Sequence, residues 1–418
     1  MFFVYQFLIF LIIAISPIII LIRFFKDKEH KTRFIEKFSL IKKNRNRGNL
    51  IWIHAASVGE LMSVVPLVHK LEKNNDIKTI LITTSTLSSS KIFSNYKFKK
   101  TIHQFFPIDF FFFSSKFIKY WKPKVAIFID SEIWPCMYKE INKNSIPLLL
   151  MNARITEKSY KRWKFFNKFT QNIFGNIEIA YPSNSDTHNY LKKLNVKKIK
   201  KIGNLKFTKN TKQKSIKFSS SFLSSINKRL ILCASSTHPS EEKIIAKTHL
   251  DLKKRFNHLL TIIIPRHVSR INEINKEIKL MNLKTVIRTS KQKINHKTDV
   301  YLVDTYGETK KFFDISKIAF IGGSLVNRGG QNPIEPARSN INIIHGPNIN
   351  NFKDIYTFFN KKKIAYKINN FNQLKYTTQK LLSIKKNKKI NLEKVGNIIL
   401  KKSIKEVVNV LNNEIKKA

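Results

Sequence analysis

The sequence predicts an α/β protein built from two doubly wound parallel sheets, one in each half of the chain. Three observations lead to this fold class. Short apolar runs alternate with helical stretches in both halves, a polar segment at residues 208–221 separates the halves, and polar or glycine-rich turns follow the apolar runs. With 418 residues, the chain is long enough for two domains of ordinary size.

The amino-terminal half contains four predicted strands, at residues 50–54, 79–84, 125–130 and 148–151. Polar residues follow three of them, namely Ser57, Gly59, Glu60, Asp130, Glu132 and Arg154. Parallel strands end at one shared edge of their sheet, and open α/β sheets bind ligands at that edge. We therefore expect these side chains to converge on one site.

Glu60 lies at the turn between the first strand and the helix that follows it. A carboxylate in that position can act as a general base. It can also simply complement the positive end of the helix dipole, as an acidic residue in a first turn often does. The residue alone does not decide between the two interpretations.

The second half repeats the alternation, with predicted strands at residues 230–233, 260–264, 300–303 and 318–321. Polar residues again follow the strands, namely Ser236, His238, Pro265, Arg266, His267, Tyr306, Gly307 and Glu308. Arg266 has the planar set of donors that suits a phosphate. The histidines fit a ligand site or an ordinary loop equally well.

The stretch from residue 318 to residue 347 predicts an anion site. Gly322, Gly323 and Ser324 allow backbone N–H groups to approach a ligand at the end of the strand. The run Asn332-Pro333-Ile334-Glu335 has the pattern of a helix start, with Asn as the N-cap, Pro at the first helical position and Glu at the third. Free N–H donors and a positive helix end attract phosphate. Asn332 and Glu335 can also do no more than cap this helix.

The composition limits the classes of partner. The formal net charge is +51, but the basic residues are spread along the whole chain, which disfavours a nucleic-acid partner. Anionic phospholipid or a phosphorylated lipid suits this charge as well. The two cysteines, Cys136 and Cys233, are far apart, and no His, Cys or Asp cluster has metal-ligand spacing. We expect a reducing cytoplasm, no metal and no cofactor.

Two further stretches bear on the membrane. Residues 1–22 carry no charge, and lysines and arginines follow at once, which favours an uncleaved anchor with the rest of the chain cytoplasmic. Pro17 leaves a partly embedded segment open, and a buried core helix is the third interpretation. The aromatic run at residues 105–113 fits core packing or a surface that touches lipid. An amphipathic helix ends the chain.

Several ordered motifs point to one family. HAASVGE, D-x-E-x-W-P, NARITEKSY, GNLKF, ASSTHPSEE, PRH, DTYGE and GGSLVNRGGQNPIEPA follow one another along the chain. In this order they resemble the 3-deoxy-D-manno-octulosonic acid (Kdo) transferases of lipopolysaccharide synthesis. The resemblance implies a GT-B fold, in which two Rossmann-like domains face each other across a cleft.

The resemblance also implies a division of labour along the chain. It implies a membrane anchor at residues 1–25, an acceptor domain at 26–210, a CMP-Kdo-binding domain at 211–395 and a C-terminal helix at 396–418. The implied reaction is inverting, metal-independent transfer of Kdo from CMP-Kdo to a lipid A precursor (lipid IVA) at the cytoplasmic face of the inner membrane. Anionic phospholipid would surround the enzyme.

Residue roles follow from the matched motifs. Glu60 would be the general base, supported by Asp130 or Glu132 and by Lys206. The CMP moiety would be held by Pro265, Arg266, His267, Tyr306, Gly307, Glu308, Asn332, Pro333, Ile334 and Glu335. Ser57, Gly59, Arg154, Ser236, His238 and Gly323 would support these groups. The family usually has Glu where this chain has Asp130, one methylene shorter, so the resemblance does not say which carboxylate acts.

Two other functions remain open from the sequence. Another GT-B glycosyltransferase would use a UDP-sugar and a lipid acceptor. A basic, membrane-associated nucleic-acid-binding protein would show steeply salt-dependent binding and would not need Glu60.

Overall fold

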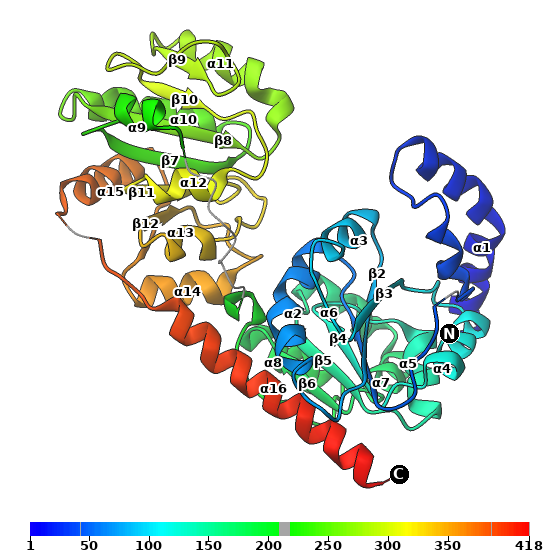
Figure 1. The fold of residues 1–418 in the computed structure, drawn as a ribbon. Coiled ribbons are helices and arrows are strands. Elements are labelled where there is room, and N and C mark those ends of the chain that lie inside the picture. Colours follow the sequence, from blue (N-terminus) through cyan, green and yellow to red (C-terminus); the bar gives the residue numbers. More distant parts are fainter. Residues whose placement is uncertain (42, 209–217, 386, 418) are drawn as a thin grey trace. The chain divides into compact units, whose positions relative to one another are not determined.

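The computed structural model describes residues 1–41, 43–208, 218–385 and 387–417 (Figure 1). The chain forms two compact units. Unit 1 comprises Met1–Asn210 and Glu393–Ala418, and unit 2 comprises Thr211–Leu392. The predicted domain boundary at 210/211 and residues 209–217 of the predicted linker lie outside the described residues.

Unit 1 contains a six-stranded sheet whose strands all run parallel, in the order β3-β2-β1-β4-β5-β6. Its strands are β1 (Leu50–His54), β2 (Thr79–Thr84), β3 (Thr101–Phe105), β4 (Val125–Ile129), β5 (Leu148–Ala153) and β6 (Ile179–Pro182). The strand order reverses between β1 and β4, so the connections leave in opposite directions from this point. Every residue of β1 and β4 is buried, as helices cover both faces of the sheet (Figure 1).

The helices of unit 1 alternate with these strands. They are α1 (Phe2–Phe25), α2 (Val58–Leu71), α3 (Leu87–Phe93), α4 (Phe111–Trp121), α5 (Pro135–Lys143), α6 (Glu157–Phe165), α7 (Asn167–Phe174), α8 (Ser185–Lys193) and α16 (Leu392–Lys416), with 3-10 turns η1 (Arg33–Phe38) and η2 (Leu205–Thr208). Ser57, Thr86, Thr156 and Asn184 cap α2, α3, α6 and α8 by accepting a backbone N–H.

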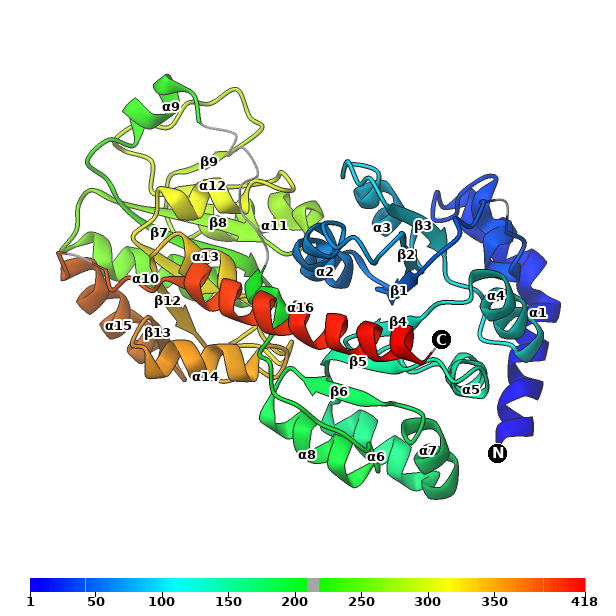
Figure 2. The same cartoon turned by 60° about the horizontal axis from the view of Figure 1, so that its bottom comes forward.

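Helix α1 is long and apolar enough to cross a membrane by length and composition. It lies beside α4 at the edge of unit 1 (Figures 1 and 2). The Tyr5 hydroxyl donates to Asp109 at 2.7 Å near one end of α1, and Arg23 pairs with Glu29 at 2.8 Å near the other. One stripe of the helix is partly or fully buried, namely Phe2, Tyr5, Gln6, Ile9, Ile13, Ser16, Ile20, Arg23 and Phe24. The other faces of α1 are exposed and apolar.

The aromatic run at residues 105–113 divides between core and surface. Phe105 and Phe106 are buried at the end of β3, whereas Phe111 and Phe112 begin α4 and are exposed, Phe112 by 60%. Core packing is therefore confirmed for Phe105 and Phe106, whereas contact of the exposed residues with lipid stays a prediction. The exposed pair lies on the helix that flanks α1.

Unit 2 contains a seven-stranded parallel sheet in the order β13-β12-β11-β7-β8-β10-β9. Its strands are β7 (Leu230–Thr237), β8 (Leu259–Pro265), β9 (Thr285–Ile287), β10 (Val300–Leu302), β11 (Ile318–Ile321), β12 (Asn342–His345) and β13 (Ala365–Lys367). Its helices are α9 (Ser220–Ser225), α10 (Glu241–Lys253), α11 (Ile271–Lys279), α12 (Thr309–Asp314), α13 (Ile334–Arg338), α14 (Lys353–Lys361) and α15 (Phe371–Ser383), with 3-10 turn η3 (Val268–Arg270). The strand order reverses between β7 and β11.

Helix α16 belongs to unit 1, although it follows unit 2 in sequence (Figure 2). Glu406 accepts a hydrogen bond from the Tyr181 hydroxyl on β6 at 2.9 Å and pairs with Lys200 at 2.8 Å. A Cβ at Gly396 would come within 2.4 Å of the Phe207 carbonyl oxygen, so glycine lets the helix approach η2 closely.

The fold class predicted from the sequence is confirmed, with two parallel-sheet α/β units and an apolar N-terminal helix. The C-terminal helix begins at Leu392, a few residues before the predicted start.

Candidate active site

The carboxylates predicted in unit 1 meet where the strand order reverses. Glu60 is in the first turn of the helix that follows β1, and Asp130 and Glu132 directly follow β4, the neighbouring strand. All three lie at the carboxyl-end edge of the sheet. The Glu60 carboxyl group is close enough to both others for their charges to shift its pKa. The structure thus brings together residues that are about seventy positions apart in sequence.

Glu60 caps its helix as the structural interpretation predicts. Its Oε2 accepts the Ala56 N–H at 2.8 Å, its Oε1 accepts the Ser57 hydroxyl at 2.8 Å, and Ser57 Oγ accepts the Glu60 N–H in return. This reciprocal arrangement resembles a capping box, except that the Glu60 carboxylate accepts the N–H of Ala56 and not that of the N-cap residue Ser57. The packing around Gly59 does not require a glycine, because an added Cβ would meet only Ser57 Oγ, at 3.9 Å.

The electrostatics of Glu60 go beyond what a cap requires. The pKa of Glu60 is raised to about 7, chiefly by burial and in addition by the negative charges of Glu132 and Asp130. The hydrogen bonds from Ser57 and Ala56 act against the shift. A surface cap would titrate near 4.5. Glu60 is therefore tuned to exchange a proton near neutral pH, as a general base must be.

Glu132 is held by two donors that the sequence did not single out. His54 Nε2 lies 3.3 Å from Glu132 Oε2, and Trp134 Nε1 donates to the same oxygen at 2.9 Å. The Tyr138 hydroxyl donates to the Glu132 carbonyl at 2.8 Å. His54 ends β1 and is the first residue of the HAASVGE motif, but the prediction gave it no role.

Asn152, to which the prediction gave no role, links Asp130 to the backbone of Leu205, the residue before Lys206. Asn152 Nδ2 donates to Asp130 Oδ1 at 3.3 Å, and Asn152 Oδ1 accepts the Leu205 N–H at 3.0 Å. Burial raises the pKa of Asp130, while the positive charges of Lys206 and Arg154 oppose the rise. Lys206 and Arg154 therefore lie close to this carboxylate, as their grouping in the prediction requires.

The switch point of unit 2 is filled from within the protein. The N–H groups of Gly323, Ser324 and Leu325 donate to the Glu241 carboxylate at 2.8, 3.1 and 3.0 Å, and the His238 N–H donates to it at 3.0 Å. The sequence predicted that N–H groups of this glycine turn face a ligand, but the buried Glu241 takes the position of that anion. The structure therefore differs from the prediction here.

Gly322 and Gly323 have a packing role in this turn. A Cβ at Gly322 would lie 2.3 Å from the Ser236 carbonyl oxygen, and Gly323 has a φ of +66°. A Cβ at Gly323 would lie 3.2 Å from the His238 ring. The glycines thus allow β7 and β11 to pack closely together at this turn.

Three outer loops of unit 2 carry the other predicted residues. Pro265 ends β8, Arg266 is exposed, and the rings of His267 and His238 are edge-on at 6.4 Å. Tyr306 is 72% exposed, next to Gly307 with a φ of +82°. Asn332 Oδ1 accepts the Ile334 N–H at 3.0 Å in a turn before α13. The helix begins at Ile334 with Pro333 as its N-cap, so the prediction that Asn332 is the N-cap and Pro333 the first helical residue is wrong by one position.

Glu308 is engaged inside unit 2. It pairs with Arg288 at 3.1 Å and with Lys311 at 2.8 Å, and the Thr305 hydroxyl donates to it. Burial alone would raise its pKa, but these partners outweigh burial and hold the pKa at about 2. Glu308 is therefore negatively charged at neutral pH, and its ion pairs hold the loop in place.

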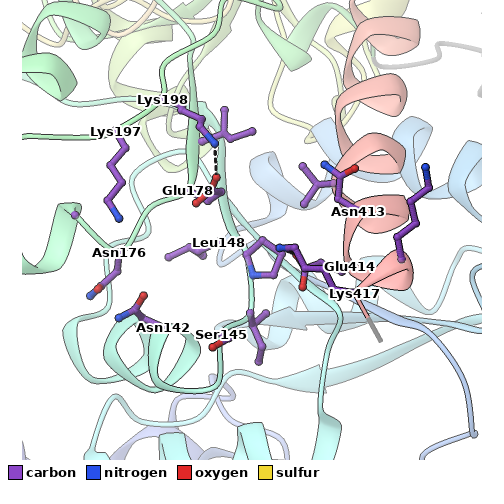
Figure 3. A pocket seen from close by; sticks show the side chains of 16 residues that line it. Asn142, Ser145, Leu148, Asn176, Glu178, Lys197, Lys198, Asn413, Glu414 and Lys417 are labelled. Atoms are coloured by element: carbon purple, nitrogen blue, oxygen red, sulfur yellow. Dashed lines mark hydrogen bonds and ion pairs between the residues drawn. The ribbon is translucent and has the colours of Figure 1, made fainter.

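A pocket of about 540 Å³ lies at the amino-end edge of the unit 1 sheet, opposite the edge that carries the three carboxylates (Figure 3). It is lined by the first residues of β5 and β6, Leu148 and Ile179, and by the end of α16. The Lys198–Glu178 ion pair crosses its wall at 2.7 Å. Because it opens at the amino ends of the strands and contains none of the predicted site residues, we do not assign the active site to it.

Comparisons with known proteins identify the family of the chain. A family model described as 3-deoxy-D-manno-octulosonic-acid transferase (kdotransferase) matches residues 32–209. The 3-deoxy-D-manno-octulosonic acid transferase of Rickettsia bellii is 37% identical over 88% of this chain and 88% of its own. The transferase of the same name from Haemophilus influenzae is 31% identical over 83% of this chain and 81% of its own.

A glycosyltransferase of known structure from Rickettsia africae has the same fold, with a TM-score of 0.58 at 14% identity over 89% of this chain and all of its own. The fold class is therefore that of the GT-B enzymes. The two sequence relatives extend through both units and exceed 30% identity. The chain belongs to the 3-deoxy-D-manno-octulosonic acid transferase family, glycosyltransferases of lipopolysaccharide biosynthesis.

Proposed function

We propose that this protein is an inverting, metal-independent transferase that moves Kdo from CMP-Kdo to a hydroxyl of a lipid A precursor (lipid IVA). The observation that carries the proposal is Glu60, a carboxyl group whose pKa is raised to about 7 beside two other carboxylates at a switch point. Membership of the Kdo transferase family supports the identity of the transferred sugar.

In this proposal Glu60 accepts the proton of the acceptor hydroxyl. The hydroxyl oxygen forms a bond to the anomeric carbon of Kdo while the bond from that carbon to the CMP phosphate oxygen breaks. CMP leaves with the electron pair, and attack from the opposite face inverts the anomeric centre. Lys206, beside Asp130, supplies positive charge that offsets the carboxylates during the transfer.

The donor is assigned to the loops of unit 2. Arg266 offers a planar set of donors to the CMP phosphate, next to His267. Tyr306 and Gly307 lie on the loop that Glu308 anchors, and Asn332 and Glu335 lie at the start of α13. Among the described residues no group of three or more His, Cys, Asp and Glu suits a metal ion.

The acceptor and location follow from unit 1. The exposed apolar faces of α1 and the exposed Phe111 and Phe112 suit a lipid surface, and Lys116 and Lys119 on the same helix suit anionic head groups. We therefore assign the protein to the cytoplasmic face of the inner membrane, among anionic phospholipids.

The test is a transfer assay with CMP-Kdo generated in place, tetraacylated lipid A precursor and EDTA. We expect product with the mass of one or more added Kdo units. Glu60→Gln keeps the shape of the side chain but cannot accept a proton, so we expect at least about a 1,000-fold loss of transfer with CMP binding retained. Glu157→Gln, on the exposed surface of α6, is the matched control and should keep full activity.

Two outcomes would contradict the proposal. If Glu60→Gln retains most of its turnover, Glu60 is not the base. If no Kdo product forms but a UDP-sugar is transferred to a lipid, the donor assignment is wrong.

A further inference from the structure

We propose that His54 is a positioning residue, which acts as a neutral hydrogen-bond donor that holds Glu132 beside Glu60. The inference deepens the proposed function and rests on it, because it assigns the group that keeps a carboxylate next to the general base. His54 is fully buried and lies at the end of β1, four residues before the start of α2, the helix whose first turn contains Glu60.

A chain of hydrogen bonds leads from Trp52 to His54. Trp52 Nε1 donates to Thr83 Oγ1 at 2.9 Å, and Thr83 Oγ1 lies 3.0 Å from His54 Nδ1, with the Thr83 carbonyl oxygen 3.3 Å from the same nitrogen. An indole N–H can only donate, so the Thr83 hydroxyl accepts from Trp52 and keeps its own hydrogen available for Nδ1, the nearer of the two contacts. In this arrangement His54 carries its proton on Nε2, which lies 3.3 Å from Glu132 Oε2.

The other tautomer suits Glu132 less well. With the proton on Nδ1, directed at the Thr83 oxygens, the bare Nε2 would face the Glu132 oxygen, and two acceptors would meet in a buried site. A second proton on the ring is disfavoured by burial, which lowers the pKa of His54 even though Glu132 acts against the shift. We therefore assign a neutral ring with its proton on Nε2.

The strand register builds this chain from local rules. Trp52 and His54 are two residues apart on β1, so their side chains lie on the same face of the sheet. Thr83 on β2 is directly paired with His54. The His54 ring stacks on Phe106 with centroids 3.9 Å apart and lies near Phe128 at 5.2 Å. These apolar walls exclude water and strengthen the hydrogen bonds inside.

The groups that face this cluster come from four other elements. Glu60 comes from α2, Asp130 and Trp134 from the segment after β4, Arg154 from the segment after β5, and Lys206 from η2. Only His54 and Trp134 donate to Glu132 Oε2 among the side-chain contacts described for unit 1. Loss of His54 would leave Glu132 free to turn away or to take up a proton. Either change removes a negative charge beside Glu60.

The test combines the His54→Phe and His54→Gln variants. Phenylalanine keeps a buried ring but has no N–H, whereas the glutamine Nε2 can still donate to Glu132. In His54→Phe we expect kcat to fall about tenfold with KM for CMP-Kdo unchanged, and the acidic limb of the pH profile to move down by roughly half a unit to one unit. His54→Gln should restore both, and His69→Phe, on the exposed face of α2, is the control.

A second measurement does not depend on turnover. ¹⁵N-histidine NMR of the full-length wild-type protein should show His54 protonated on Nε2 alone at pH 7. In Thr83→Val, which removes the hydroxyl between Trp52 and His54, the Nδ1 tautomer should become populated. A wild-type ring protonated on Nδ1, or a His54→Phe variant with unchanged kcat and pH profile, would overturn the inference. If instead Glu60→Gln stays active, the proposed base fails while the NMR result still decides the role of His54.

Discussion

Glu60 holds a proton at a pH where most carboxylic acids have lost theirs, and this has a cost in stability. Its pKa is about 7 in the folded protein against 4.5 for an ordinary Glu. Between these values the folded state binds more protons than the unfolded state, so the contribution of Glu60 to the free energy of unfolding falls as pH rises from 4.5 to 7 and stays low above 7.

Glu60→Gln should therefore stabilise the protein at alkaline pH while it removes activity. We expect the variant to exceed the wild type by about 1–3 kcal/mol in the free energy of unfolding at pH 8, and by much less at pH 5. Urea unfolding at the two pH values measures this difference. An equal difference at both pH values would show that Glu60 has an ordinary pKa, and Glu157→Gln should show no pH-dependent gain.

Whether a residue of the candidate site could be predicted depended on how close its hydrogen-bond partners lie in the sequence. Glu60 and its Ser57 cap could be predicted because a strand, a turn and an acidic first turn follow one another directly. His54, Asn152 and Glu241 could not, because their partners are set by the fold. Glu241 and Gly323 are 82 residues apart, and no local pattern indicates that their chain segments meet.

At the scale of elements, the turn after β11 depends on one buried carboxylate. Glu241 accepts four N–H groups with its two oxygens. Glu241→Gln is nearly isosteric, but its amide group would turn N–H donors toward N–H donors. We expect a loss of about 2–4 kcal/mol in the free energy of unfolding, measured by urea denaturation. Glu277→Gln on the exposed face of α11 is the control, and an unchanged midpoint in Glu241→Gln would contradict this account.

Helix α1 gives a prediction about the membrane. Its buried stripe and the contacts of Tyr5 and Arg23 tie both of its ends to unit 1. A spanning helix would instead extend away from the unit for about 30 Å. We therefore expect α1 to lie along the membrane surface, with the N-terminus on the same side as unit 1.

An epitope tag placed before Met1 tests this orientation. In spheroplasts the tag should resist protease added from outside and become accessible only after lysis. Cleavage of the tag in intact spheroplasts would show that α1 spans the bilayer. A tag after Ala418 serves as the control for the side of the membrane on which unit 1 lies.

At the scale of the whole molecule, the alternating pattern was enough to predict two parallel α/β units. It missed the short strands at the sheet edges, such as β9 and β13, because three residues leave little periodicity to detect. The net charge of +51 indicated an anionic partner but not which one. The pattern also predicted polar residues at the carboxyl ends of the strands. It did not predict which strands are neighbours, because the strand order, and with it each switch point, is a property of the complete sheet.

The place of α16 has a consequence for how the protein is made. Unit 1 contains both ends of the chain, and the Tyr181–Glu406 contact joins residues 225 positions apart. On the ribosome, all of unit 2 has been synthesised before α16 emerges, and domains generally fold as their chain appears. The unit that is begun first is thus completed last. Until α16 has emerged, the face that receives it is uncovered, and unit 2 is the first part of the chain that can reach its final structure.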